Sequence, residues 1–484
     1  MPASAIGQQF ERVCRDRAGR VAVQALPAGE TTTFADLAAE CRAIERALID
    51  VGVGPGAVVV SVVGNRPIFF ALFVACMEAG VALVPLGEAT EAEAAALIEQ
   101  AGAVAVITDR DLPLHAVREH PLGAGVRLVR LADRESPPQY GASVVLKLTS
   151  GSTDLPKAAI AAEAHLVNDG RHIIEAMGIA PTDINFSCIP LSHAYAIGNI
   201  VMPLVWQGTP VALRQSFSPS QFVHDIGGSG ATVFPGVPFM FERIRAREPI
   251  DQLPASLRLL ITAGAAIEAD TVAWFRRHLG RKVHSFYGSS ETGGITYDDG
   301  EDVSEPVHLG RAMPETTVAI RPPGQGQPDG RIFVSGNAVA SGYARGDGDP
   351  VSGFSGGGFL TGDLGHLDGA GRLILTGRVS PLVNVAGRKV DPAEVERRLL
   401  ELPGIAAARV LGAACDTRGQ EVVAFLVRTN AALTPLAIRQ QCAETLSTHK
   451  IPRRFIFVEG FPVDARGKVD RRALLRLASR ADVE

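Results

Sequence analysis

Apolar runs of strand length alternate with helical patterns along most of the chain, and this alternation limits the possible folds more than any other feature of the sequence. A buried strand is expected at residues 57–63, a helix at 68–79, a strand at 81–85, a helix at 91–101 and a strand at 103–108. The same order returns in a helix at 163–177 and strands at 209–213 and 257–262. Strands that are apolar on both faces need cover on both faces, so repeated units of this kind predict parallel sheets flanked by helices.

The character of the sequence changes near Gly310. Turn residues become frequent, and short strands are expected at residues 331–335 and 372–376, which predicts a β-rich subdomain over about residues 310–378. After Arg378, helices are expected at 392–402 and 435–446, and strands at 406–412, 421–427 and 454–458. We therefore predict an α/β protein with a large N-terminal domain over residues 1–378 and a small C-terminal α+β domain over residues 379–484.

Composition excludes several classes of protein. The 484 residues carry 47 basic and 52 acidic side chains, a net charge of −5, which argues against a dedicated nucleic-acid binder. The six cysteines form no C-x-x-C pair, so reduced core thiols of a cytoplasmic protein are expected rather than a zinc knuckle or a disulfide scaffold. The first 20 residues lack an apolar signal segment, and the apolar run at 68–77 is too short to span a bilayer, so no membrane insertion is expected.

A loop rich in hydroxyl groups follows the apolar strand that is expected at residues 144–148. It contains Thr149, Ser150, Gly151, Ser152 and Thr153 and ends at Lys157. Hydroxyl and backbone N–H groups at this density favour an anion site, to which the lysine adds a mobile positive charge. The spacing is not that of a G-x-x-x-x-G-K-[ST] loop. A polar surface loop is the alternative interpretation.

Three further segments carry residues suited to a nucleotide site. Residues 284–294 combine the aromatic pair Phe286 and Tyr287 with several glycines and with Glu291, a carboxylate that suits Mg²⁺ beside phosphate oxygens. Asp363, in a Thr-Gly-Asp turn, can accept two ribose hydroxyls, although a turn or helix-cap aspartate is the plainer interpretation. Lys468 lies on a charged loop near the C-terminus, where a lysine alone is usually no more than solvated.

Taken in this order, the four segments resemble the adenylate-forming superfamily, which includes acyl- and aryl-CoA synthetases, the adenylation domains of peptide synthetases, and luciferases. Residues 190–195, 263–266, 377–378 and 387–396 add matching segments, so the resemblance covers nearly the whole chain. It implies that ATP and Mg²⁺ convert a carboxylic acid into an acyl adenylate, and that the acyl group then passes to the thiol of CoA or of the phosphopantetheine of a carrier protein. A carrier would be a separate protein, and the enzyme would be a monomer or a homodimer.

The resemblance also implies roles for individual residues. The β- and γ-phosphates of ATP would lie against Thr149, Ser150, Gly151, Ser152, Thr153 and Lys157. Adenine would lie against Gly264, Ala265, Ala266, Ser285, Phe286, Tyr287 and Gly288, and the ribose against Asp363 with Arg378 nearby. The catalytic residues would be Ser290 at the α-phosphate, Glu291 at the magnesium, Lys468 between the acid and the α-phosphate, and His193 at the acid.

The same resemblance makes the C-terminal domain a mobile lid that carries Lys468 and turns about a hinge at Ser380. After the turn, residues 383–390 would form part of a second face that closes the site for the thiol.

Several positions depart from the pattern of the superfamily. Asp154 stands where glycine is usual, which puts the geometry of the phosphate loop in question. Ser290 replaces a threonine and Ala266 a frequent proline. Ser380 stands where a charged hinge residue is common, and Asn384 replaces a frequent lysine in the segment that would meet the thiol acceptor.

The acid pocket that the resemblance implies is lined by His193, Tyr195, Gly198, Pro235, Gly236, Val237, Gly264, Gly293 and Gly294. These residues are mostly small and apolar, and no aspartate stands where amino-acid-activating domains hold the substrate ammonium. An aromatic acid or a short to medium acyl chain is therefore favoured as the substrate. A packed loop histidine is the alternative interpretation of His193.

Two other functions compete with an acid–thiol ligase. One is a stand-alone adenylation enzyme of the amino-acid type, and the other is a non-catalytic nucleotide-binding protein. A hydrolase is disfavoured, because residues 353–357 fit G-x-S-x-G but lack the apolar helix that should follow a nucleophile elbow.

Overall fold

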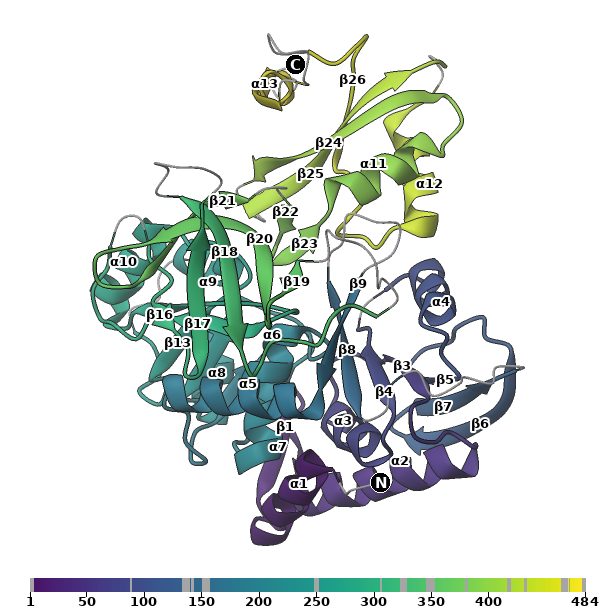
Figure 1. Cartoon of the computed structure of the whole chain (residues 1–484), viewed down its shortest axis with the longest axis vertical. Coiled ribbons are helices and arrows are strands. Elements are labelled where there is room, and N and C mark those ends of the chain that lie inside the picture. The colour runs from purple at the N-terminus through teal and green to yellow at the C-terminus, as the bar shows by residue number, and fades with distance from the viewer. Residues whose placement is uncertain are drawn as a thin grey trace. The chain divides into compact units, whose positions relative to one another are not determined.

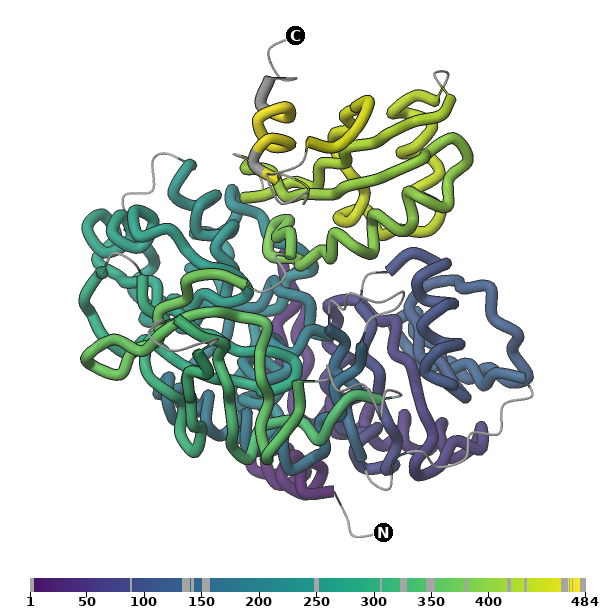
Figure 2. Tube along the Cα trace, turned by 45° about the horizontal axis from the view of Figure 1, so that its top comes forward, coloured from purple at the N-terminus to yellow at the C-terminus, as the bar shows by residue number. Residues whose placement is uncertain are grey.

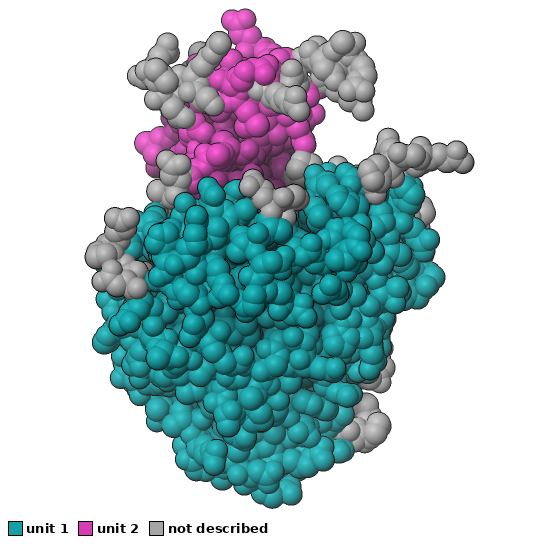
Figure 3. Space-filling view, turned by 90° about the vertical axis from the view of Figure 1, so that its left-hand side faces the viewer, with its two compact units in different colours: residues 1–88, 98–149, 158–379 teal, residues 89–97, 150–157, 380–484 magenta. Residues whose placement is uncertain are grey.

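A computed structural model gives the course of the chain (Figures 1 and 2). It describes residues 4–87, 89–132, 140, 143–149, 157–247, 252–304, 307–322, 329–344, 353–378, 382–415, 419–430, 433–462, 469 and 471–480. The chain divides into two compact units, which Figure 3 shows in different colours. Unit 1 comprises residues 1–88, 98–149 and 158–379, and unit 2 comprises residues 89–97, 150–157 and 380–484.

A nine-stranded sheet lies at the centre of unit 1. Its strand order is β16-β15-β14-β13-β12-β10-β11-β1-β2. The bounds are β1 (Val21–Leu26), β2 (Glu30–Thr33), β10 (Asn185–Ser187), β11 (Val211–Arg214), β12 (Val233–Gly236), β13 (Leu259–Thr262), β14 (Val283–Ser289), β15 (Gly293–Tyr297) and β16 (Arg311–Ala312). The neighbouring strands β14, β13, β12, β10, β11 and β1 run parallel to one another. Strand β2 at one edge, and β15 and β16 at the other, pair antiparallel with their neighbours.

A second, seven-stranded sheet has the order β6-β7-β5-β3-β4-β8-β9. The bounds are β3 (Val58–Val62), β4 (Ala82–Pro85), β5 (Ala105–Thr108), β6 (Ala116–Gly123), β7 (Val126–Leu131), β8 (Val144–Thr149) and β9 (Lys157–Ala162). Its central strands β5, β3, β4 and β8 are parallel, as the apolar runs predicted, whereas the hairpin β6–β7 was not predicted.

Helices cover these sheets and bury their apolar faces. The bounds are α1 (Ala5–Asp16), α2 (Phe34–Asp50), α3 (Ile68–Glu78), α5 (Glu163–Ala176), α6 (Ala194–Ala196), α7 (Met202–Gln207), α8 (Phe222–Ser229), α9 (Pro238–Arg245) and α10 (Ala269–Leu279), and the π-helical turn η1 spans Ile197–Val201. Helix α3 is apolar on every side, and Phe69, Phe70 and Phe73 are each 0% exposed. The prediction of a buried helix in this run is therefore confirmed.

The β-rich part of unit 1 is an antiparallel sheet with the order β17-β18-β20-β19, in which β21 also pairs with β20. The bounds are β17 (Thr316–Arg321), β18 (Gly330–Gly336), β19 (Phe354–Ser355), β20 (Gly358–Leu367) and β21 (Leu373–Arg378). Ser355 of the G-x-S-x-G match lies in the β19–β20 hairpin, with a strand rather than a helix after it, so the nucleophile-elbow context is absent.

Unit 2 has its own small core around a five-stranded sheet. The bounds are α4 (Glu91–Gln100), of which residues up to Leu97 belong to this unit, β22 (Val383–Val385), β23 (Arg388–Val390), α11 (Pro392–Leu400), β24 (Ile405–Cys415), β25 (Gly419–Arg428), α12 (Pro435–Thr445), β26 (Arg454–Phe457) and α13 (Arg471–Arg480). The predicted α/β class is confirmed. The boundary between residues 378 and 379 and the mobility of the C-terminal domain stay predictions.

Two further sequence expectations concern thiols and membranes. None of the six cysteines, all of which the structure describes, forms a disulfide, five of them are buried, and burial raises the pKa of the Cys76 thiol to about 12. In the described chain, no helix combines the length and the apolar character that crossing a bilayer requires.

Candidate functional site

The carboxyl ends of parallel neighbouring strands bring the predicted site segments to one edge of the nine-stranded sheet. Val237 follows β12, Gly264 follows β13, and Ser290 with Glu291 follows β14. The segment with His193 comes after β10 in the same sheet. In open α/β sheets ligands bind outside the carboxyl ends of the strands. The fold therefore gives these separate segments a common edge at which a ligand can meet all of them.

The turn between β14 and β15 is tied to two other parts of unit 1. The Ser290 hydroxyl donates to the carbonyl oxygen of Leu148, near the end of β8, at 3.1 Å. The Tyr343 hydroxyl donates to Oε1 of Glu291 at 2.7 Å, and the backbone N–H of Ala340 donates to the carbonyl oxygen of Glu291 at 2.8 Å. Burial and the neighbouring Glu291 carboxylate raise the pKa of Tyr343, so this phenol stays a hydrogen-bond donor.

Glu291 fits the magnesium role that the resemblance implies. Mg²⁺ keeps several waters and usually takes only one or two protein carboxylates together with substrate phosphates. The hydrogen bond from Tyr343 fixes one carboxylate oxygen of Glu291 and orients the other. Within the described ranges no group of three or more His, Cys, Asp or Glu side chains could hold a metal ion by itself.

Asp363 joins two other predicted residues on neighbouring strands. Its Oδ2 accepts from the Tyr287 hydroxyl at 2.6 Å, and its Oδ1 lies 2.9 Å from Nε of Arg378. Asp363 on β20 and Arg378 on β21 are paired in register, so the backbone places the ion pair. Burial and the Asp363 carboxylate raise the pKa of Tyr287 well above its ordinary value. The structure thus brings these three residues together, and their contact with a ribose stays a prediction.

The two aromatic residues of the predicted adenine segment differ in exposure, since Phe286 is buried and Tyr287 is only partly buried. Phe286 is 6% exposed and stacks on Tyr195, with ring centroids 5.8 Å apart and an interplanar angle of 28°. Its ring is therefore part of the core rather than an open face. Gly264 and Ala266 after β13 are exposed and Ala265 is half-buried, so that segment of the predicted adenine site is open.

The predicted acid-pocket segments include buried small residues. A Cβ atom at Gly236 would lie 2.9 Å from the ring of Phe234, so a side chain there would need the ring to move. The hydroxyl oxygen of Tyr195 is buried and has no hydrogen-bond partner among the described residues. His193 is exposed at the N-terminus of the short helix α6. The lining role of these residues stays a prediction.

Several predicted residues lie outside the described residues. They are Ser150, Gly151, Ser152, Thr153, Asp154, Ser380 and Lys468. The flanks of the phosphate loop are described, since Thr149 ends β8 and Lys157 begins β9. Asn384, in place of a frequent lysine, accepts the backbone N–H of Gly387 at 2.9 Å, and its own N–H donates to Gln420 at 2.8 Å, so it holds the turn before β23.

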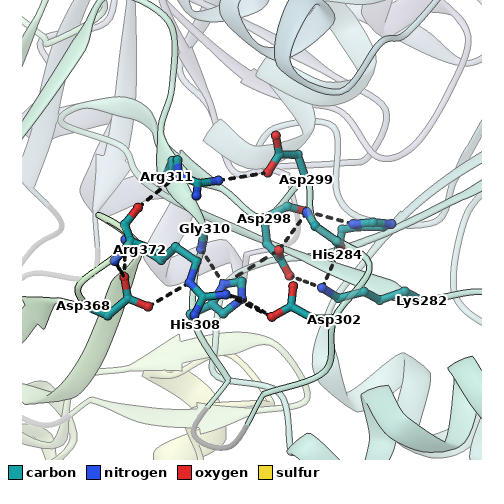
Figure 4. A network of polar contacts seen from close by, with 12 residues as sticks. Lys282, His284, Asp298, Asp299, Asp302, His308, Gly310, Arg311, Asp368 and Arg372 are labelled. Atoms are coloured by element: carbon teal, nitrogen blue, oxygen red, sulfur yellow. Dashed lines mark hydrogen bonds and ion pairs between the residues drawn. The ribbon is translucent and has the colours of Figure 1, made fainter.

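A network of charged residues supports the predicted adenine segment from within unit 1 (Figure 4). Lys282 lies 2.7 Å from Oδ2 of Asp298, and both side chains are nearly inaccessible to solvent. The backbone N–H of Asp298 donates to the carbonyl oxygen of Ser285 at 2.9 Å. Arg372, just before β21, pairs with Asp302 at 2.9 Å. The network links the β14–β15 hairpin to the strand that carries Arg378.

A cavity of about 640 Å³ lies elsewhere in unit 1, between α1, α5 and α7, and its lining includes Arg17, Arg171 and Trp206. None of the sequence-predicted site residues lines this cavity. The candidate site is therefore located by the strand ends and by the hydrogen bonds between the predicted residues, not by this cavity.

Sequence reasoning missed two features of this region. Tyr343 lies in a stretch that showed only frequent turns, so nothing in the local pattern pointed to a partner for Glu291. Lys147 stands inside the strand that was predicted as apolar, and its charge was the signal that this strand has a polar partner.

Comparisons with known proteins give the relatives of this chain. A family model described as AMP-binding enzyme matches residues 10–344, and a model of the AMP-binding enzyme C-terminal domain matches residues 394–468. A sulfoacetate–CoA ligase from Cupriavidus necator is 30% identical over 350 residues, which cover 71% of this chain and 68% of the relative. A feruloyl-CoA synthase from an Amycolatopsis species is 27% identical over 91% of this chain and 93% of its own.

Among solved structures, the chain is similar to a double mutant of o-succinylbenzoate CoA synthetase from Bacillus subtilis bound with its product analogue. The TM-score is 0.84 at 24% sequence identity, and the match covers 96% of this chain and 98% of the other. This likeness shows a shared fold over almost the whole length of both chains.

Proposed function

The chain belongs to the family of AMP-binding enzymes, and from that premise we propose that it is an AMP-forming acid–CoA ligase. The resemblance to the adenylate-forming superfamily is confirmed by the two family models, which together extend from residue 10 to residue 468. The observation that carries the proposal is the β14–β15 turn, where Ser290 is bonded to the end of β8 and Glu291 is oriented by Tyr343. This turn holds the Ser290 hydroxyl against the strand that leads into the phosphate loop, with the oriented Glu291 carboxylate next to it in sequence.

The proposed reaction has to overcome the repulsion between two anions. A carboxylate must approach the α-phosphate of ATP, and negative charge grows on the phosphate oxygens as the new bond forms. Lys157 and Lys468 supply positive charge, and the hydroxyl groups of Ser290 and of the phosphate loop supply hydrogen bonds. Glu291 would hold Mg²⁺, which when bound would neutralise phosphate charge. Asp363 fixes the ribose, so that the α-phosphate meets the acid in one orientation.

The acid proposed for this enzyme is an aromatic acid or a short to medium acyl acid. The small residues of the predicted pocket support this range, and the two relatives named above are a sulfoacetate–CoA ligase and a feruloyl-CoA synthase. We propose CoA as the acceptor, because both relatives are CoA enzymes. A separate carrier protein with a phosphopantetheine thiol is the second acceptor to test.

Acid-dependent exchange of pyrophosphate into ATP tests this proposal. The panel should contain aromatic, short-chain, medium-chain, sulfonated and amino acids, each with Mg²⁺. The proposal expects exchange with at least one acid that has no ammonium group, and loss of that exchange in Glu291→Gln. Exchange with amino acids alone would support the amino-acid-type enzyme instead, and no exchange with any acid would support a non-catalytic nucleotide binder. Mass spectrometry of thioesters made with CoA or with a phosphopantetheinylated carrier then distinguishes the acceptors.

A further inference from the structure

A lysine lies in the interior of unit 1, on the strand that leads into the phosphate loop. Lys147 belongs to β8, two residues before Thr149, and its side chain is 2% exposed. Its ammonium lies 3.6 Å from Oδ2 of Asp169 on α5, whose side chain is 5% exposed. Within the described residues this is the only ion pair of the ammonium, which makes no hydrogen bond there.

The Asp169 carboxylate also holds the backbone of the segment that follows Glu291. Its Oδ1 accepts the N–H of Gly294, at the start of β15, at 2.8 Å. A Cβ atom at Gly293 would lie 2.5 Å from the same oxygen, and Gly293 has a φ of +67°. Glycine at this position therefore leaves the room that the carboxylate occupies and allows the turn of the backbone beside it.

Asp169 reaches a third predicted segment on its other side. A Cβ atom at Gly198, in η1, would lie 3.2 Å from Oδ2 of Asp169 and 2.7 Å from Cδ1 of Ile173. Helix α5 packs against both β15 and η1. One carboxylate thus lies between the backbones of two segments that were both predicted to line the acid pocket.

A buried ion pair of this kind contributes little net stability to a fold. Removing two charges from water costs several kcal/mol, and apolar residues of similar volume often replace a buried pair with no loss of stability. What apolar residues cannot replace is the acceptor for the Gly294 N–H and the attachment of that acceptor to β8 through Lys147.

We propose that Lys147 and Asp169 are positioning residues of the adenylation site. They link three segments that the reaction needs in register: the strand before the phosphate loop, η1 beside the acid, and the turn that carries Ser290 and Glu291. This inference rests on the proposed function of the site. It assigns no contact with a substrate to either residue, because both act through the backbone that they hold.

A matched pair of double variants separates positioning from simple stabilisation. Both variants, K147M/D169N and K147M/D169L, lack the two buried charges, but only the side-chain amide of K147M/D169N can still accept the N–H of Gly294. We expect both to fold. K147M/D169N keeps the bond to Gly294 but loses the link to β8 through Lys147, so its kcat for acid-dependent exchange should lie between those of the wild type and of K147M/D169L. In K147M/D169L the kcat should fall by about tenfold or more, since small misplacements of catalytic groups cost up to on the order of 10²-fold. Equal kcat values in the two folded variants, whether both near the wild-type value or both reduced, would overturn the proposal.

Amide hydrogen exchange of residues 293–297 gives a readout that needs no catalysis. The Gly294 amide should exchange faster in K147M/D169L than in K147M/D169N, and unchanged protection would count against the proposal even if the wild-type chain activated no acid. A chain without exchange activity but with this difference in protection would refute the proposed function and leave the positioning role intact. Should a double variant fail to fold, K147L/D169N and K147L/D169V form a second pair with the same contrast.

Discussion

At the scale of single residues, the clearest arrangement is the Asp363 carboxylate with Tyr287 and Arg378. Asp363→Ala removes the acceptor that is expected to hold the ribose. Hydrogen bonds to charged groups contribute about 1.5–3 kcal/mol, so kcat/KM for ATP should fall by about 10- to 100-fold. The matched control is Tyr287→Phe, which removes one hydroxyl and leaves the pair between Asp363 and Arg378, and its loss should be smaller. A folded Asp363→Ala variant with an unchanged KM for ATP would contradict the assignment.

A second prediction concerns the free energy of unfolding. Lys147→Met leaves the Asp169 carboxylate buried without its cation, and breaking a buried pair on one side costs about 3–5 kcal/mol. The double variant K147M/D169L should recover most of that loss, because no charge is then left inside. Urea denaturation of the wild type and both variants measures the three free energies. If the single variant is as stable as the double one, the two side chains are not an interacting pair in solution.

The third residue-scale prediction concerns Lys468. Lys468→Ala should lower the rate of adenylate formation by on the order of 10²–10³, the usual effect of losing one electrostatic contact to a transition state. Transfer to the thiol from a supplied acyl adenylate should remain largely intact, since the lysine serves only the first step. Pyrophosphate release and thioester formation, measured separately, check the two halves. Unimpaired adenylation would remove Lys468 from the mechanism.

Single residues were predictable where their type alone carries chemistry. Ordered motifs singled out Ser290, Glu291, Asp363 and Arg378, whose roles stay predictions. Ser290 and Glu291 follow β14, whereas Asp363 lies within β20 and pairs with Arg378 at the end of β21. Tyr343 could not be predicted, because its role depends on a hydrogen bond to Glu291, which lies 52 positions away in the sequence. The pairing of Lys147 with Asp169 was hidden for the same reason, since a charge in an apolar strand does not say which helix supplies its partner.

At the scale of elements, helix α5 holds the polar interior together and its N-terminus depends on a histidine. The Nδ1 atom of His165 accepts the N–H of Ala162, the N-cap residue, at 3.1 Å. Burial, with the nearby Lys147 ammonium adding to it, lowers the pKa of His165 below its ordinary 6.5. Because the folded-state pKa is the lower one, this contribution to stability is complete above the unfolded-state pKa and is lost as the pH falls through the folded-state value.

The lowered pKa of His165 predicts how the stability of the protein depends on pH. The free energy of unfolding of the wild type should fall below about pH 6.5, by no more than about 1.4 kcal/mol per pH unit for one proton. His165→Gln removes the titration but keeps an acceptor for the N-cap N–H, as in a capping box. Denaturation curves above and below that pH should show a steeper loss for the wild type than for the variant. Parallel pH dependences would mean that protonation of His165 does not affect the helix.

Helices and strands could be predicted where the hydrophobic pattern of their residues is strong, and were missed where it is weak. Residues 68–79 gave α3 almost to the residue, because a run that is apolar on every side leaves only a buried helix at that length. The hairpin β6–β7 was missed, since β6 is mostly exposed and carries charged residues that favour no particular period. The π-helical turn η1 depends on tertiary packing around Gly198, which no local pattern records.

At the scale of the whole molecule, the two family models and the two compact units describe an enzyme of a large and a small part. We expect the two parts to serve two successive half-reactions, adenylation and then transfer to a thiol. The order of motifs along the chain was the strongest evidence for this class, because each motif alone has an ordinary structural explanation. The substrate was not predictable, since it depends on the shape that small residues leave rather than on a chemical group they carry.

A ligase of the proposed kind cleaves ATP between the α- and β-phosphates and captures the acid as a thioester. Quantifying the products with ATP, Mg²⁺, CoA and the best acid of the panel tests it most directly. We expect AMP, pyrophosphate and acyl-CoA in equal amounts, and none of the three when the acid is left out. Formation of ADP and phosphate, or AMP released without any acyl product, would contradict it.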